Sequence, residues 1–270
     1  MDFKNKVVII TGASSGIGKS CAEELAGRGA TLVLAARQFV TLCEITANLE
    51  KVYGIKALAV QADVSKEEEC EHLVKQAVLT FGRVDVLINN AGISMRALFN
   101  DLDLSVLKNL MDVNFWGTVY CTKFALPEIL KTKGSIIGVS SIAGYRGLPG
   151  RSGYSASKFA MNGFMESLRT ELMAKRVHVM LACPGFTSSN IRYTALSKDG
   201  VSLGDTNMEE GKMMSAEEVA VTIVNGIAAR KRTLVMTGQG KLTVWLNKLL
   251  PSLADKLVFK HYQKEKDALI

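Results

Sequence analysis

Apolar residues along the chain form short continuous runs, which alternate with longer segments where apolar and polar residues recur at helical spacing. The runs predict strands at Val7–Thr11, Thr31–Ala35, Ala57–Gln61, Val84–Asn89, Ser135–Ser140, Val177–Ala182 and Thr233–Met236. The periodic segments predict helices over 17–28, 38–53, 67–81, 103–131, 153–175 and 216–230. Continuous apolar strands that alternate with helices are typical of a parallel sheet covered on both faces. The pattern therefore predicts a single-domain, doubly wound α/β fold with its ligand site at the strand carboxyl ends.

Two segments interrupt this alternation. Residues 186–214 form a long polar stretch with scattered apolar side chains, and Ser215 with Glu218 predicts a capping box for the helix that follows. Residues 241–264 place leucines and Trp245 at helical spacing, with lysines between them, and Pro251 suits the first turn of a second helix. This tail either packs over the substrate entrance or a subunit interface, or makes a peripheral membrane contact as an interfacial helix pair.

Composition narrows the functional class. The 270 residues carry 33 basic and 26 acidic side chains, for a net charge of +7, without the interleaved basic and aromatic blocks that favour nucleic-acid binding. Five scattered cysteines predict reduced thiols, and three distant histidines predict no metal site. The charged start before the first strand predicts no signal peptide, and no apolar run is long enough to span a bilayer. We therefore expect a cytoplasmic protein.

The first strand leads into a glycine-rich turn, TGASSGIG, in which Gly12, Gly16 and Gly18 have the spacing G-x3-G-x-G. Such a turn lets the backbone approach a pyrophosphate, and the next helix directs its N-terminus at the negative charge. The alternative is a plain strand-to-helix turn. Its position on the first strand of a βαβ unit favours dinucleotide binding in a Rossmann-type fold.

The end of the second strand bears on the choice of coenzyme. Ala36 occupies the place where an acidic residue would hold the ribose 2′-hydroxyl of NAD, and Arg37 follows it. A guanidinium can pair with the 2′-phosphate of NADP, so these residues favour NADP(H) over NAD. The alternative is that Arg37 is a solvated surface residue.

A tyrosine and a lysine stand four residues apart in YSASK, as Tyr154 and Lys158. At this spacing they share one face of a helix, and the lysine ammonium is expected to lower the pKa of the tyrosine hydroxyl towards neutrality. Alone, the pair could be an ordinary helix face. Ser141 follows a strand 13 residues before Tyr154, where its hydroxyl could hydrogen-bond a substrate carbonyl. Acid–base chemistry on a carbonyl is therefore the favoured interpretation.

Taken together, TGASSGIG, NNAG at 89–92, the Asn114 segment, Ser141, YSASK and the Pro184–Gly185 pair resemble the short-chain dehydrogenase/reductase family over roughly residues 5 to 237. The resemblance implies that Tyr154 is the acid/base, that Ser141 orients the substrate oxygen, and that Lys158 binds the nicotinamide ribose. It also implies that Asn114 holds a water in a proton relay and that Asp63 contacts the adenine. The implied cofactor site consists of Gly12, Ser14, Ser15, Gly16, Ile17, Gly18, Arg37, Asp63, Val64, Asn90, Ala91, Gly92, Tyr154, Lys158, Pro184, Gly185, Thr187 and Ser189.

One departure from the family pattern concerns the coenzyme. Ser15 stands where many NADP-preferring members carry a basic residue, so Arg37 must supply most of the discrimination. We expect residues 1–237 to form an NADP-binding catalytic domain, extended by amphipathic helices over 238–270. The expected reaction is reversible hydride transfer between NADP(H) and an apolar ketone or alcohol, such as a steroid, a 3-ketosphinganine-like lipid or a xenobiotic. Helices 103–131 and 153–175 predict a homodimer or homotetramer by the same resemblance.

Two other functions remain open from the sequence. A dinucleotide-binding regulator would have no need of the Ser141, Tyr154 and Lys158 set. A doubly wound methyltransferase would leave YSASK unexplained.

Overall fold

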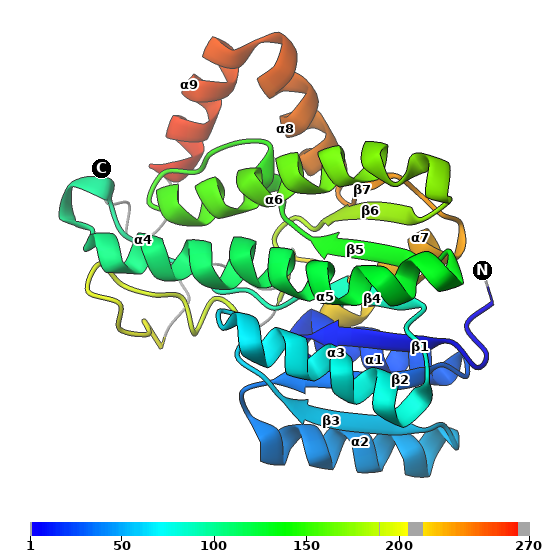
Figure 1. The fold of residues 1–270 in the computed structure, drawn as a ribbon. Helices are drawn as coiled ribbons and strands as arrows, with labels where there is room; N and C mark the ends of the chain where they lie inside the picture. Colours follow the sequence, from blue (N-terminus) through cyan, green and yellow to red (C-terminus); the bar gives the residue numbers. More distant parts are fainter. Residues whose placement is uncertain (1, 189, 205–212, 264–270) are drawn as a thin grey trace.

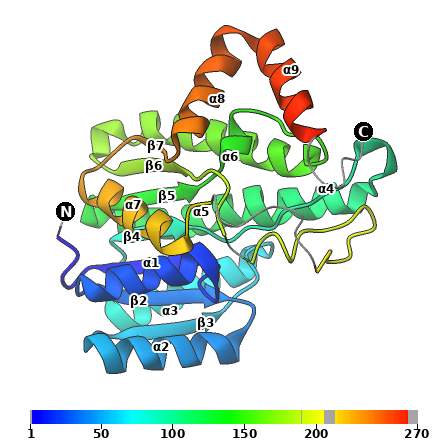
Figure 2. The same ribbon diagram turned by 180° about the vertical axis from the view of Figure 1, so that it is seen from behind.

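The computed structural model describes residues 2–188, 190–204 and 213–263, and these form a seven-stranded parallel sheet with helices on both faces (Figures 1 and 2). The strands are β1 (Val7–Thr11), β2 (Thr31–Ala36), β3 (Ala57–Gln61), β4 (Val86–Asn89), β5 (Ser135–Val139), β6 (His178–Cys183) and β7 (Thr233–Val235). The helices are α1 (Gly16–Gly27), α2 (Phe39–Tyr53), α3 (Glu67–Phe81), α4 (Leu104–Met111), α5 (Gly117–Thr132), α6 (Ser152–Glu171), α7 (Ala216–Ala228), α8 (Gly238–Leu249) and α9 (Pro251–Tyr262). The predicted fold class is confirmed.

The strand order is β3-β2-β1-β4-β5-β6-β7, so the chain moves outward from β1 to β3 and then returns to place β4 beside β1. Adjacent crossovers diverge at this point, and their loops leave a crevice beyond the carboxyl ends of β1 and β4. The glycine-rich turn follows β1, and the NNAG segment follows β4. The topology therefore brings the two motifs together at the switch point.

Two apolar cores lie on opposite faces of the sheet, because successive strand residues point to opposite sides. On one face, Val8 and Ile10 pack in a cluster with residues of α1, α2 and α7, which Figure 2 shows in front. On the other face, Ile9 and Leu87 pack with residues of α3, α5 and α6, most of which Figure 1 shows in front. This two-sided burial explains why the strands read as continuous apolar runs.

The helix predicted over 103–131 is not continuous. It divides into α4 and α5, and a π-helical segment at Asp112–Trp116 joins them. The helix predicted over 153–175 also ends early, at Glu171, and a 3₁₀ turn at Met173–Lys175 follows it. A π-helical turn inserts one extra residue into the helical ladder, which sequence periodicity does not reveal over so short a span.

Several local predictions agree with the structure. Ser215 accepts a hydrogen bond from the Glu218 N–H at 3.1 Å while the Glu218 carboxylate accepts one from the Ser215 N–H at 2.9 Å, which completes the capping box at α7. Pro251 is the first residue of α9. Figure 1 shows α8 and α9 as a helix pair at one end of the molecule, beyond α6. Among the described residues, no helix is long and apolar enough to cross a bilayer.

Candidate active site

A cleft of about 1590 Å³ opens at the carboxyl ends of the strands. Its lining comes from the segments that follow β1 to β6, and from α8 and α9. Among the described residues, the sequence-predicted set that lines it includes Gly12, Ser14, Ser15, Gly16, Ile17, Arg37, Asp63, Val64, Asn90, Ala91, Gly92, Ser141, Tyr154, Lys158, Pro184, Gly185 and Thr187. Gly18 and Asn114 lie behind this lining and pack against it, as shown below. Ser189 lies outside the described residues.

The glycine turn at the end of β1 requires its glycines. Gly12 has φ of 65°, and a Cβ added to it would lie 2.8 Å from the Ala91 Cα. A Cβ on Gly18 would overlap the Gly12 carbonyl and come 2.5 Å from the Asn90 side-chain nitrogen. The α1 N-cap, Ser15, makes no side-chain cap hydrogen bond, and the first turn carries no acidic residue. The helix N-terminus is therefore suited to an anion in the cleft.

Asn90 holds this turn in place from the neighbouring strand. Its side-chain amide donates to the Thr11 carbonyl at 2.9 Å and to the Gly12 carbonyl at 3.1 Å. The backbone N–H groups of Asn90 and Ala91 each donate to the Thr11 hydroxyl at 3.0 Å. The sequence predicts Asn90 as a residue of the cofactor site. The structure shows that the Asn90 side chain also holds the glycine turn through these hydrogen bonds.

Two charged residues lie at the β2–β3 end of the cleft. Arg37 is exposed directly after β2, and Asp63 follows β3. Asp63 is oriented by Ser65, whose N–H and hydroxyl donate to Oδ1 at 3.0 and 2.8 Å. The cleft therefore presents a guanidinium and a carboxylate to one end of a long ligand.

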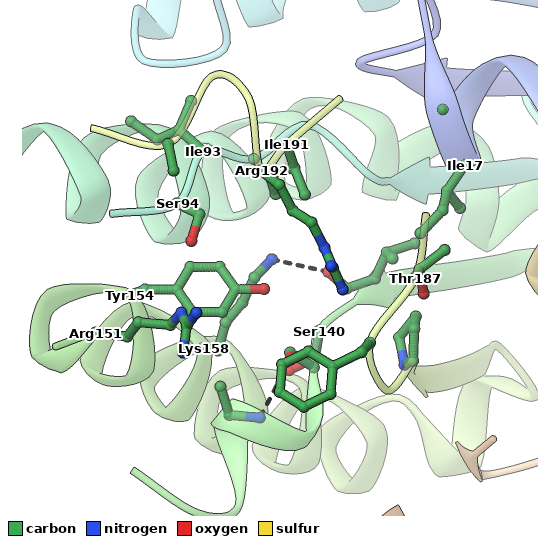
Figure 3. A pocket seen from close by; sticks show the side chains of 18 of the residues that line it. Ile17, Ile93, Ser94, Ser140, Arg151, Tyr154, Lys158, Thr187, Ile191 and Arg192 are labelled. Atoms are coloured by element: carbon green, nitrogen blue, oxygen red, sulfur yellow. Dashed lines mark hydrogen bonds between the residues drawn. The ribbon is translucent and has the colours of Figure 1, made fainter. Parts of the chain in front are cut away.

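Tyr154 and Lys158 lie near the start of α6 (Figure 3). Ser141 follows β5. The Lys158 ammonium is buried, donates to the Val139 carbonyl at 2.9 Å, and lies 5.8 Å from the centroid of the Tyr154 ring. Burial lowers the pKa of Lys158 to about 8. The residues that the sequence selected for proton chemistry are thus brought together at the middle of the cleft.

The pKa of Tyr154 is raised above its ordinary value. Burial raises it and outweighs the opposing effects of the hydrogen bond with Ser141 and of the nearby Arg151 charge. The net shift of the Tyr154 pKa is therefore opposite to the lowering that we expected from Lys158.

Asn114 lies in the π-helical segment, behind the centre of the cleft. Its Oδ1 accepts from the Ile93 N–H at 2.8 Å, and its Nδ2 donates to the Ile93 carbonyl at 3.0 Å and the Ser157 hydroxyl at 2.8 Å. A Cβ added to Gly92 would meet the Asn114 Oδ1 at 3.2 Å and the Lys158 Nζ at 3.5 Å. Asn114 and Lys158 therefore face a common space beside Gly92, which only a residue without a side chain leaves open.

The loop after β6 closes one side of the cleft. Pro184 accepts from the Ile142 N–H at 3.2 Å, and a Cβ on Gly185 would lie 2.9 Å from the Thr237 methyl. Thr187 is buried, and its hydroxyl donates to the Gly185 carbonyl at 3.2 Å. These contacts hold the loop against β5 and the start of α8.

The tail helices contribute to the lining of the cleft, which agrees with one of the two alternatives stated for this segment. Arg146 donates to the Asn247 side chain at 2.9 Å and to the Asp255 carboxylate at 2.6 Å, and Asn247 donates to the Tyr145 carbonyl at 2.9 Å. Leu242 and Leu246 of α8 line the cleft with residues of α9. Trp245 and Leu249 do not line it and are more than half exposed.

Sequence reasoning missed three arginines that line the cleft: Arg96, Arg151 and Arg192. Arg151 is the N-cap residue of α6, three residues before Tyr154, so its closeness to Tyr154 in the chain could have suggested it. Arg96 and Arg192 carry no such signal, because each belongs to an irregular segment that only the tertiary structure brings to the site.

Comparison with known proteins agrees with this geometry. A family model described as short chain dehydrogenase matches residues 6–199. The chain is 39% identical over 249 residues to 11-beta-hydroxysteroid dehydrogenase-like 4A of Arabidopsis thaliana. The aligned region covers 92% of this chain and 82% of that relative.

Two solved structures resemble the fold. One is a short chain dehydrogenase/reductase from Burkholderia phymatum in complex with NAD, with a TM-score of 0.83 and 25% identity over 94% of this chain and 96% of that one. The other is an alcohol dehydrogenase from Thermococcus sibiricus complexed with 5-hydroxy-NADP, with a TM-score of 0.77 and 25% identity over 86% of this chain and 95% of that one. Proteins with this fold thus bind either type of dinucleotide.

Proposed function

This chain belongs to the short-chain dehydrogenase/reductase family, and we propose on that basis that it transfers hydride reversibly between NADP(H) and a carbonyl compound or secondary alcohol. The observation that carries this proposal is the convergence of Ser141, Tyr154 and Lys158 in a cleft that also contains the glycine turn of β1. A binding protein would need the glycine turn but not a phenol, a hydroxyl and a buried ammonium at one point.

The residues of the cleft fit a dinucleotide. Backbone close to the glycine turn and the N-terminus of α1 would hold the diphosphate, Asp63 the adenine end, and Lys158 the nicotinamide ribose. Arg37, with Ala36 in the place of a carboxylate, supports NADP over NAD because its guanidinium can pair with a 2′-phosphate. When bound, the nicotinamide supplies or accepts the hydride.

In the reductive direction, Tyr154 would donate its proton to the carbonyl oxygen as negative charge develops there. A hydrogen bond from Ser141 would stabilise the same oxygen. The raised pKa of Tyr154 keeps its hydroxyl protonated at neutral pH, so the proton is present when the carbonyl compound binds. In the oxidative direction the tyrosine must lose its proton, so the positive charges of Lys158 and Arg151 would matter more.

Asn114 would complete a proton path. Its Oδ1 and the Lys158 Nζ face the space beside Gly92, where a water could accept a proton from the ammonium. With a pKa of about 8, Lys158 can both hold and release a proton near neutral pH. The path would replace the proton that Tyr154 gives to the substrate.

The lining supports an apolar or lipid-like ketone as substrate. Leu148, Leu196, Leu242 and Leu246 line the cleft. The relative named for 11-beta-hydroxysteroid dehydrogenase activity adds support for a bulky apolar substrate. Steroids, 3-ketosphinganine-like lipids and xenobiotic ketones all fit this description.

The organisation of the chain follows from the same proposal. Residues 238–270 would extend the catalytic domain of residues 1–237, since α8 and α9 contribute to the cleft. The exposed aromatic side chains of Trp116 on the π-helical segment and Phe159 on α6 support pairing between subunits as a homodimer or homotetramer. A monomer at micromolar concentration in light scattering would contradict the pairing.

The test of the function is NADPH oxidation with a panel of apolar ketones. Tyr154→Phe keeps the ring but removes the transferable proton, so we expect turnover to fall at least about a hundredfold while NADPH affinity stays near that of the wild type. The family function would be wrong if the wild type bound NADPH tightly and turned over no carbonyl compound. The mechanism would be wrong if Tyr154→Phe retained near-normal turnover.

A further inference from the structure

The face of α6 that carries Tyr154 and Lys158 continues for one more turn, to Asn162. The three residues are spaced four apart, so they lie along one side of the helix. Asn162 is 6% exposed and does not belong to the cleft lining. A buried amide in a helix interior destabilises the fold unless its polar atoms find partners. The partners of Asn162 therefore show what this side chain holds in place.

Both ends of the Asn162 amide bind the segment that follows β5. The Ser140 hydroxyl donates to Oδ1 at 2.6 Å, and Nδ2 donates to the Gly144 carbonyl at 2.8 Å. A carbonyl oxygen can only accept a hydrogen bond, so the contact with Gly144 fixes the direction in which the amide points. One side chain thus ties residues 140 and 144 to α6.

The segment and the helix meet at close range. A Cβ added to Gly144 would lie 2.8 Å from both the Asn162 Nδ2 and the Ser140 Oγ. The same Cβ would lie 3.0 Å from the Lys158 carbonyl oxygen. One turn earlier on α6, the Lys158 ammonium donates to the Val139 carbonyl at 2.9 Å. Side chains of α6 therefore hold this segment at its start, through Lys158, and on both sides of Ser141, through Asn162.

Ser141 lies between the two residues that Asn162 binds. Its hydroxyl oxygen accepts from the Ala143 N–H at 3.1 Å, within the 3₁₀ turn Ile142–Gly144. A serine hydroxyl carries one hydrogen, and a bond that uses only its oxygen leaves this hydrogen to be donated to another oxygen. Ser141 also forms a hydrogen bond with Tyr154. The direction of the Ser141 hydroxyl therefore depends on the turn that Asn162 holds.

We propose that Asn162 is a positioning residue for the reaction, which holds Ser140 and Gly144 and thereby directs the Ser141 hydroxyl at the carbonyl oxygen of the substrate. This assignment rests on the proposed function, because that function gives the Ser141 hydroxyl its role. Asn162 lies outside the cleft lining, so its effect on the reaction passes through Ser141. A substitution at Asn162 should then affect the rate of reduction more than the binding of NADPH.

The first test measures the anchor without a substrate. Hydrogen exchange of the amides at 142–145 is compared in the full-length wild type and in Asn162→Leu, which keeps the size of the side chain and removes both hydrogen bonds. We expect about tenfold faster exchange in the variant, because the turn opens more easily. Leu168→Ala is the matched control, since it weakens the packing of the same helix at a buried position outside the cleft lining. Equal exchange in the wild type and Asn162→Leu overturns the proposal.

The second test asks whether the anchor acts through Ser141. The kcat of NADPH-dependent reduction is measured with 2-decanone and with 1-decalone. Asn162→Leu should lower kcat about ten- to a hundredfold and change the Kd of NADPH less than about threefold, whereas Leu168→Ala should keep the wild-type kcat. In a Ser141→Ala background, Asn162→Leu should cost less than about threefold, because the side chain that it positions is gone. Equal losses in the two backgrounds overturn the proposal.

The conservative variant Asn162→Asp adds a pH signature. A protonated carboxyl group can donate to the Gly144 carbonyl and accept from Ser140, as the amide does, whereas a carboxylate has no hydrogen to donate. The kcat of this variant relative to the wild type should therefore fall as the pH rises through the pKa of the new carboxyl group, which burial raises. The other titratable groups near Ser140 are the same in both proteins: Tyr145, Lys158, Glu166 and Cys183. A kcat that is reduced as strongly at about pH 5.5 as at about pH 9 overturns the proposal.

Failure of the general function would give a different pattern. If the wild type reduces neither ketone nor any other carbonyl compound, the proposed reaction is wrong, and the exchange at 142–145 decides whether Asn162 holds the turn. If the wild type is active and Asn162→Leu keeps its kcat, the reaction stands and the positioning role is wrong. Should Asn162→Leu fail to fold, Ser140→Ala takes its place. It removes one of the two hydrogen bonds and should lower kcat about three- to tenfold.

Discussion

Replacing Gly18 by alanine should damage the dinucleotide site even though alanine favours helices. Gly18 lies in the first turn of α1, where an added Cβ would come 2.9 Å from the Gly12 carbonyl carbon and 2.5 Å from the Asn90 Nδ2. That nitrogen donates to the carbonyls of Thr11 and Gly12. The methyl group must therefore displace either α1 or the Asn90 amide that holds the glycine turn.

The magnitude follows from competing contributions. Alanine in place of a helical glycine stabilises the fold by about 0.5–1 kcal/mol. Overpacking costs about 1–3 kcal/mol, and weakening one Asn90 hydrogen bond costs about 0.5–1.5 kcal/mol. The expected net loss in the free energy of unfolding is about 1–3 kcal/mol. Displacement of the turn should also weaken NADPH binding by about tenfold or more, since ~1.4 kcal/mol is enough for that change.

Gly163→Ala provides the matched control. Gly163 lies in the interior of α6, and no atom would come within 4 Å of its added Cβ. This variant should be more stable than the wild type by about 0.5–1 kcal/mol and should bind NADPH normally.

The assay is urea denaturation followed by fluorescence titration with NADPH, on all three proteins under one condition. If Gly18→Ala matches Gly163→Ala in stability and the wild type in NADPH affinity, the close approach at Gly18 does not constrain the site. The glycine turn would then not form the dinucleotide cradle.

Three further changes test other parts of the molecule. Arg37→Asp should reverse the coenzyme preference, because it removes a partner of the 2′-phosphate and adds one for a ribose hydroxyl; an unchanged ratio of kcat/KM for NADPH and NADH would leave Arg37 a surface residue. Lys158→Met should abolish turnover and yet raise the free energy of unfolding at pH 7 by up to about 3 kcal/mol. The reason is that burial lowers the pKa of Lys158 from 10.5 to about 8, so keeping this ammonium protonated at pH 7 destabilises the folded wild type. The unfolded chain binds more protons than the folded one between these pKa values, so the wild type regains stability as the pH rises from 8 towards 10.5; an advantage of the variant that stays constant from pH 7 to 10 would contradict this account. Trp245→Ser with Leu249→Ser should abolish flotation with anionic liposomes without slowing turnover, because both side chains are exposed on α8 away from the cleft; a wild type that does not float at low salt would exclude the peripheral contact.

The sequence alone determined most of the secondary structure. The predicted ranges of β1 and β3 and of α3 agree with the structure to the residue, and most other ends agree within about two residues. The physical reason is that strands buried on both faces must be apolar throughout, while covering helices must alternate with helical period. The glycine turn could also be recognised, because its positive φ at Gly12 and its close backbone contacts admit no other residue.

The motifs also indicated which side chains would meet, since the carboxyl ends of parallel strands share one edge of the sheet. Ser141 and Tyr154 belong to segments that follow this edge, and the structure places both in the cleft. Four-residue spacing by itself predicts that Tyr154 and Lys158 share one helix face. Such local rules hold here because both residues lie within one continuous helix, α6.

Tertiary structure decided the rest. The π-helical segment around Asn114 depends on contacts with Ile93 and Ser157, which lie 21 and 43 residues away in the chain. The direction of the Tyr154 pKa depends on how much water is excluded from the site, and burial outweighs the neighbouring charges. The pairing of the segments around Ala97 and Gly150 depends on a backbone hydrogen bond between two irregular loops. Periodicity and spacing report on a residue's near neighbours, whereas solvation, electrostatics and loop pairing depend on atoms that only folding brings together.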